Sequence, residues 1–155
     1  MKRILGIGAL AMGLCGTAAA TDLGLSYDLS NILAPAGAAT SMGASYYLDD
    51  SSELMVGLDM HFMGEEFALN SVDIAYLMHG DGDGIHSLMG GGVSITNVTD
   101  DMGLSLMGGI GFQSDLGFFD NASVRGWTGL SIAVMPDVMV MSMSSNLGLH
   151  YKFGL

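Results

Sequence analysis

Residues 137–155 read DVMVMSMSSNLGLHYKFGL, and this stretch decides the fold. From Met139 onward the odd positions are apolar except for Ser145, whereas the even positions are mostly small or polar. Successive side chains of a β-strand point to opposite faces, so an alternation with a period of two predicts a strand. This strand is much longer than the about five or six residues of a typical soluble strand. One of its faces is apolar and the other is small and polar.

The beginning of the chain has the order of a secretory signal peptide. Met1-Lys2-Arg3 is basic, residues 4–14 are apolar, and Ala18-Ala19-Ala20 provides small residues for cleavage. We therefore expect a signal peptide over residues 1–20 and one domain over residues 21–155. The single cysteine, Cys15, lies in the expected signal. The mature chain would then have no thiol, no disulfide and no cysteine metal site.

The charge and hydropathy of the remaining chain exclude several classes of protein. Beyond the signal only Arg125 and Lys152 are basic, against sixteen acidic residues in the whole chain. A nucleic-acid-binding surface needs clustered lysines and arginines, so we expect no nucleic-acid partner. No run approaches the about 20 apolar residues of a spanning helix. A glycine-rich chain this apolar, with 24 glycines, must bury its surface in a core or expose it to lipid, and in lipid the remaining option is a closed barrel.

The alternation of residues 137–155 recurs along the chain, with turns rich in Gly, Asp, Ser or Pro between the segments. The predicted strands cover residues 22–30, 39–49, 53–63, 67–79, 85–98, 102–113 and 122–134. Eight tilted spans of about ten residues need about 80 residues, which the chain supplies. The sequence predicts an all-β fold, an eight-stranded antiparallel up-and-down transmembrane β-barrel with meander order.

The small polar face is expected to line the interior. A soluble lipocalin-like barrel would have the opposite arrangement, but its outer face would carry more charge than these Gly- and Ser-rich positions do. Trp127 falls on the inner face, as do several titratable side chains, namely Arg125, Lys152, Asp28, Asp59, Asp73, His61 and His150. Because a buried charge is costly unless it is paired, we predict that Arg125 and Lys152 lie in a carboxylate network.

The C-terminal strand resembles the closing strand of bacterial outer-membrane barrels. Its outward positions would be Leu147, Leu149, Tyr151, Phe153 and Leu155, which such proteins use as an assembly signal. The mature chain as a whole resembles small eight-stranded outer-membrane proteins of the OmpA, OmpX and OmpW kind. This resemblance implies a monomer in the cell outer membrane of a Gram-negative bacterium, in contact with lipid and lipopolysaccharide and folded by the barrel-assembly machinery. It implies no cofactor.

Acidic turns suggest cation sites. Asp81-Gly82-Asp83-Gly84 resembles the start of a calcium loop, but Gly92 stands where the bidentate glutamate would be expected, which favours a simple turn. Other acids, including Glu53, could bridge divalent cations to lipopolysaccharide phosphates, although a solvated acidic rim is the preferred interpretation.

Neither the histidines nor the methionines indicate a reactive or metal site. His86 and Ser87 are neighbours on a strand and point to opposite faces, so they cannot form a nucleophile–base pair. His150 and Ser144 share a face but lie too far apart along the strand. The three methionines at 139, 141 and 143 offer thioethers to copper(I), but lipid contact explains them better.

The sequence therefore predicts a non-enzymatic barrel with a packed polar lumen and a structural or surface-interaction role. Two alternatives stay open, a barrel enzyme that modifies envelope lipids, such as a lipid A deacylase or acyltransferase, and a narrow pore for small solutes.

Overall fold

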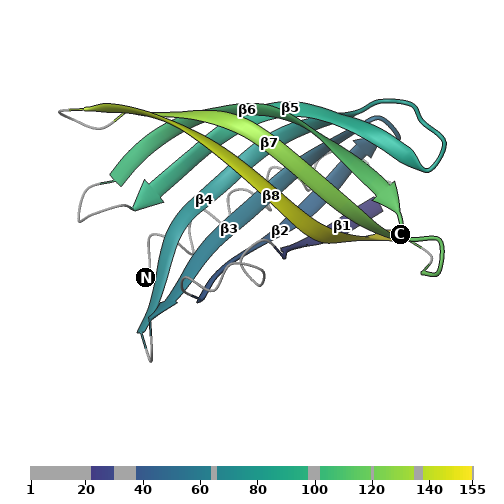
Figure 1. Ribbon diagram of the computed structural model, residues 1–155, viewed down its shortest axis with the longest axis horizontal. Coiled ribbons are helices and arrows are strands. Elements are labelled where there is room, and N and C mark those ends of the chain that lie inside the picture. The colour runs from purple at the N-terminus through teal and green to yellow at the C-terminus, as the bar shows by residue number, and fades with distance from the viewer. Residues whose placement is uncertain are drawn as a thin grey trace.

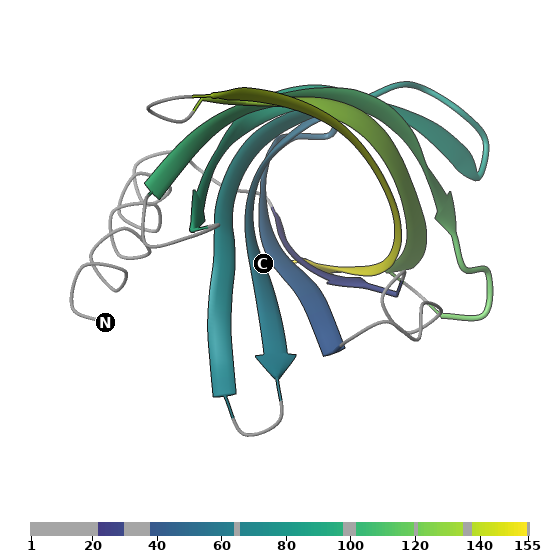
Figure 2. The same cartoon turned by 60° about the vertical axis from the view of Figure 1, so that its left-hand side comes forward.

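The computed structural model describes residues 22–29, 38–63, 66–97, 102–119, 121–134 and 138–154. These ranges form eight strands: β1 (Asp22–Asp28), β2 (Ala38–Asp49), β3 (Ser52–Met63), β4 (Glu66–His79), β5 (Ile85–Asn97), β6 (Met102–Asp115), β7 (Ala122–Val134) and β8 (Met139–Gly154). Each strand pairs antiparallel with the next, and β8 returns to β1, which closes the barrel (Figures 1 and 2). The predicted eight-stranded meander is confirmed. Residues 1–20, the expected signal peptide, lie outside the described residues.

Within these ranges we find no α-helix with the length and hydropathy of a transmembrane helix.

The strand register fixes how steeply the strands tilt. Following cross-strand partners once round the barrel from Leu25 leads through Ala44, Val56, Ile74, Val93, Leu106 and Ile132 to Met141. Leu25 itself pairs with Tyr151, so the sheet closes with an offset of ten residues, the difference between positions 151 and 141. With eight strands at ordinary spacing, this offset corresponds to a tilt of about 40° and a backbone radius of about 8 Å. A barrel this narrow can be filled by side chains.

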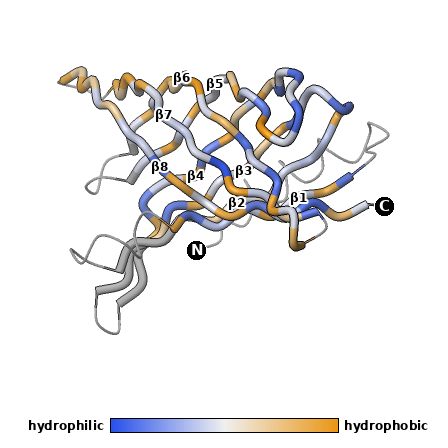
Figure 3. The backbone as a smooth tube through the Cα atoms, turned by 45° about the vertical axis from the view of Figure 1, so that its right-hand side comes forward, coloured by the Kyte–Doolittle hydropathy of each residue, from blue (hydrophilic) through white to orange (hydrophobic). Residues whose placement is uncertain are grey.

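The outward face of the barrel is apolar. The exposed large hydrophobic side chains alternate along the strands, as Leu104, Leu106 and Ile110 do on β6 and Met139, Met141 and Met143 do on β8. In Figure 3 the hydrophobic positions recur between paler ones along β5 to β8. The exposed carboxylates of Asp50, Asp81, Asp83 and Asp115 instead lie at strand ends and turns. The result is an apolar belt bordered at one end by acidic turns.

Glycines on the inner face make room for Trp127. A Cβ atom built at Gly109 would lie 2.8 Å from Cζ2 of the Trp127 indole, and one at Gly129 would lie 2.9 Å from its Nε1. Trp127 thus lies in the lumen, as its place in the alternation predicts. Its large ring fits because both of these neighbouring positions lack side chains.

The lumen is filled toward the end where β1 begins and β8 ends. Buried side chains gather there from six strands, namely Tyr47, Glu53, Leu77, Leu88, Arg125 and His150. Toward the opposite end the inner positions Ser142, Ser144 and Asn146 of β8 are exposed. The polar core is therefore concentrated at the terminal end of the barrel.

Candidate functional site

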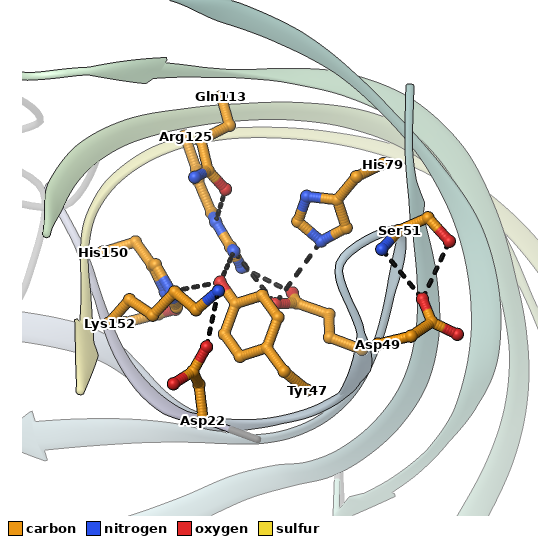
Figure 4. A network of polar contacts seen from close by, with 11 residues as sticks. Asp22, Tyr47, Asp49, Ser51, His79, Gln113, Arg125, His150 and Lys152 are labelled. Atoms are coloured by element: carbon orange, nitrogen blue, oxygen red, sulfur yellow. Dashed lines mark hydrogen bonds and ion pairs between the residues drawn. The ribbon is translucent and has the colours of Figure 1, made fainter. Parts of the chain in front are cut away.

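Arg125 is the centre of the buried polar layer at the terminal end of the lumen. This β7 residue is 8% exposed, and its guanidinium donates from Nη1 to Oε1 of Glu53 at 2.5 Å and from Nη2 to Oε2 at 2.9 Å. Nε donates to Oε1 of Gln113 at 2.8 Å, and Nη2 also donates to the Tyr47 hydroxyl at 2.7 Å (Figure 4). The planar fork of arginine matches a carboxylate in this bidentate arrangement, which is among the strongest hydrogen-bonded pairs in proteins.

Glu53 is the carboxylate that neutralises Arg125, and it is fully buried. Its interpretation as part of a solvated acidic rim is wrong. Glu53 is the second residue of β3 and has the same parity as Met55, Gly57 and Asp59, so its side chain points into the lumen rather than into the turn. The neighbouring turn residues Asp49 and Asp50 are exposed.

Tyr47 and His150 extend the layer across the barrel. The Tyr47 hydroxyl lies 2.8 Å from Nε2 of His150, and Nδ1 of His150 lies 2.8 Å from Oγ of Ser26. Both ring nitrogens of His150 are therefore engaged, one by the Tyr47 hydroxyl and the other by the Ser26 hydroxyl.

His79 and Lys152 flank this layer on the side that faces the end of the barrel. Nε2 of His79 lies 3.5 Å from Oε2 of Glu53, and the His79 ring centroid is 5.9 Å from that of Tyr47. Lys152 forms an ion pair with Asp22 at 2.8 Å, and its Nζ lies 4.4 Å from the centroid of the Tyr47 ring. The Lys152 ammonium thus has both a carboxylate and an aromatic face as partners.

Asp59 and Asp73 make contacts elsewhere in the lumen. Ser41 donates to Oδ1 of Asp59, and Ser71 donates to Oδ2 of Asp73 at 3.4 Å. Arg125 and Lys152 each have a carboxylate partner. These partners are Glu53 and Asp22, and not Asp59 or Asp73.

Asp28 and His61 were also expected in the charged network of the lumen. Asp28 is the last residue of β1 and stands opposite Gly148 in the register. The side chain of His61 lies outside the described residues.

The predicted assembly signal lies on the outward face of β8. Leu147, Leu149, Tyr151 and Phe153 are exposed, and the rings of Tyr151 and Phe153 meet edge to face at 4.7 Å. Leu155 lies outside the described residues.

The chemistry of this layer is that of charge pairing. His150 does contact a serine hydroxyl, but it is 2% exposed and its second nitrogen is held by a tyrosine, so a substrate has no access to the pair. In the part of the chain that the structure describes, no three His, Cys, Asp or Glu side chains are grouped to hold a metal ion. Asp81 to Gly84, expected as a simple turn rather than a calcium loop, joins β4 to β5, and Gly84 adopts a φ of 76° there.

Sequence reasoning missed four members of the layer and the flanking His79. Ser26, Tyr47, Glu53, His79 and Gln113 were not among the expected site residues, although alternation places each of them on the inner face. Parity identifies which side chains enter the lumen. It does not say which of them share a level, because that depends on the register.

No protein-family model and no curated protein sequence matches this chain. The crystal structure of the N-terminal β-barrel domain of Pseudomonas aeruginosa OprF is similar, with a TM-score of 0.52, and the match covers 86% of this chain and 98% of the OprF chain. The two chains share the fold of a closed β-barrel domain. The two sequences are 13% identical, so the likeness concerns the fold.

Proposed function

We propose that the protein is an integral outer-membrane β-barrel, a non-enzymatic monomer with a structural or surface-interaction role. The observation that carries this proposal is the apolar outward face of a closed barrel. Closure supplies partners for backbone groups that lipid cannot bond, and the outward side chains suit hydrocarbon.

The dimensions of the barrel support a membrane location. Strands of 13 or 14 residues, such as β5, β6 and β7, tilted by about 40°, rise by about 30 Å, which is close to the thickness of the hydrocarbon core. A soluble monomer rarely exposes a contiguous apolar patch beyond a few hundred Å². The exposed belt continues from β5 to β8, which favours outer-membrane lipid and lipopolysaccharide as its surroundings.

The charged layer supports a structural role over a pore. Arg125, Glu53, Tyr47 and His150 bond one another across the terminal half of the lumen and obstruct it. The outward aromatic pair on β8 supports recognition by the barrel-assembly machinery.

Membrane fractionation combined with heat-modifiable gel migration tests the proposal. We expect the protein in the outer-membrane fraction, with the unheated form migrating differently from the boiled form. Recovery from the soluble periplasm without detergent would contradict it.

Two further assays address the alternatives. The mass spectrum of lipid A should be the same with and without the protein, whereas loss or gain of an acyl chain would support an enzyme. Well-resolved single-channel steps in planar bilayers would support a pore.

A further inference from the structure

A cavity of about 510 Å³ opens at the terminal end of the barrel, next to the charged layer. We call it the terminal vestibule. Its lining includes the buried side chains of His79 and Ser123, the half-buried Lys152, and the exposed carboxylates of Asp50, Asp81 and Asp115. A cavity of this size lies within the range of small-molecule sites.

Two buried polar atoms in the vestibule lack hydrogen-bond partners among the described residues. Ser123 is 2% exposed, and its Oγ has no partner. The His79 side chain is 10% exposed, and its Nε2 makes no hydrogen bond, although Oε2 of Glu53 lies 3.5 Å away. Buried polar atoms are seldom left unpaired, so these two point to a polar group that enters the cavity.

The charges in the vestibule are ordered by depth. The inner part presents the Lys152 ammonium, the Ser123 hydroxyl and the His79 imidazole, all of which can donate to an anionic group. The outer part presents three carboxylates, and that of Asp115 is 59% exposed. A simple anion would be repelled by this rim, whereas a simple cation would meet Lys152 inside.

We propose that the terminal vestibule binds a small zwitterion of the α-amino acid class. The carboxylate lies inward against Lys152 and Ser123, and the ammonium group lies outward among Asp50, Asp81 and Asp115. Lys152 is already held by Asp22 at 2.8 Å and by the Tyr47 ring, so the ligand carboxylate meets a cation that is fixed in place. The site is separate from the membrane-facing surface on which the proposed function rests.

The proposal is tested on the whole barrel folded in detergent micelles. Saturation-transfer NMR with an equimolar mixture of the standard L-amino acids identifies the best ligand, and calorimetric titration then compares that amino acid with its deaminated and decarboxylated analogues. We expect the amino acid to bind at least about tenfold more tightly than either analogue, because each analogue loses one charge-assisted contact.

Ser123→Ala is the decisive variant. The hydroxyl has no partner within the described chain, so its removal should leave the melting midpoint of the unliganded barrel unchanged while weakening amino-acid binding several-fold. Lys152→Met should weaken binding by about tenfold or more. Ser144→Ala, an exposed inner position toward the opposite end, is the matched control and should bind like the wild type.

Three results would overturn the proposal. These are no saturation transfer to any amino acid, a deaminated analogue that binds as tightly as the amino acid, and a Ser123→Ala variant that binds with unchanged affinity. The membrane location is measured separately, by fractionation. A failed binding experiment would therefore overturn the amino-acid site and would leave the proposed function untouched.

Discussion

Arg125→Ala is the substitution for which the structure gives the largest expected loss of stability. The guanidinium makes two bonds to Glu53 and one each to Gln113 and Tyr47, and Glu53 is fully buried. Removing the arginine leaves a buried carboxylate without its counter-charge, which costs about 3–5 kcal/mol in comparable cases. The equilibrium constant for unfolding should therefore rise by about two to nearly four orders of magnitude.

The assay is equilibrium unfolding in urea of the barrel in lipid vesicles, read from the fraction that migrates as the folded form in unheated gels. Lys152→Met is the control, because its ion pair with Asp22 is partly exposed and such pairs contribute about 0–1 kcal/mol. A loss below about 1 kcal/mol for Arg125→Ala would refute the reasoning, since it would mean that water reaches Glu53 freely.

A double variant separates lost charge pairing from lost packing. Arg125→Met with Glu53→Leu removes both charges and keeps apolar volume in the lumen. We expect the double variant to be more stable than Arg125→Ala alone, because no unpaired charge is left. Equal or lower stability would show that the layer stabilises the barrel mainly through its neutral hydrogen bonds.

Three other outcomes follow from the faces and packing of the barrel. Leu106→Arg places a charge on the apolar belt and should destabilise the folded barrel in bilayers by about 2–4 kcal/mol. Ser144→Arg on the inner face should cost far less stability. Equal losses of stability in urea titrations would contradict the assignment of the two faces. Gly109→Val forces a side chain against the Thr128 carbonyl oxygen, Gly129 and the Trp127 indole, and it should cost about 1–3 kcal/mol. Gly117→Ala, with open space around it, should stay within about 0.5 kcal/mol by the same titration. Phe153→Ala should lower the amount of folded protein in isolated outer membranes, and an unchanged amount would remove this side chain from the assembly signal.

The number of strands, their order and their faces could be predicted because each depends on local pattern. Alternation defines a strand and its two sides, and polar turns divide one strand from the next. The inward position of Trp127 illustrates this, since parity alone placed it there and the structure adds the glycines that accommodate it.

The composition of the charged layer could not be predicted because it depends on register and tilt. Glu53 and Arg125 are 72 residues apart and meet only because the offset at closure brings the beginnings of β3 and β7 to one level. Glu53 also follows a turn rich in aspartate, so composition favoured a solvated site. Its parity on β3 was the one signal that pointed into the lumen.

The alternating contact of β8 with lipid is the most direct test of the central claim. The native cysteine, Cys15, lies within the expected signal, so single cysteines can be placed at Met141, Ser142, Met143 and Ser144 and labelled with a fluorophore. In vesicles containing brominated lipid, we expect strong quenching at 141 and 143 and weak quenching at 142 and 144. Quenching that does not alternate, or that is stronger at the serine positions, would contradict a barrel whose outward face meets the membrane.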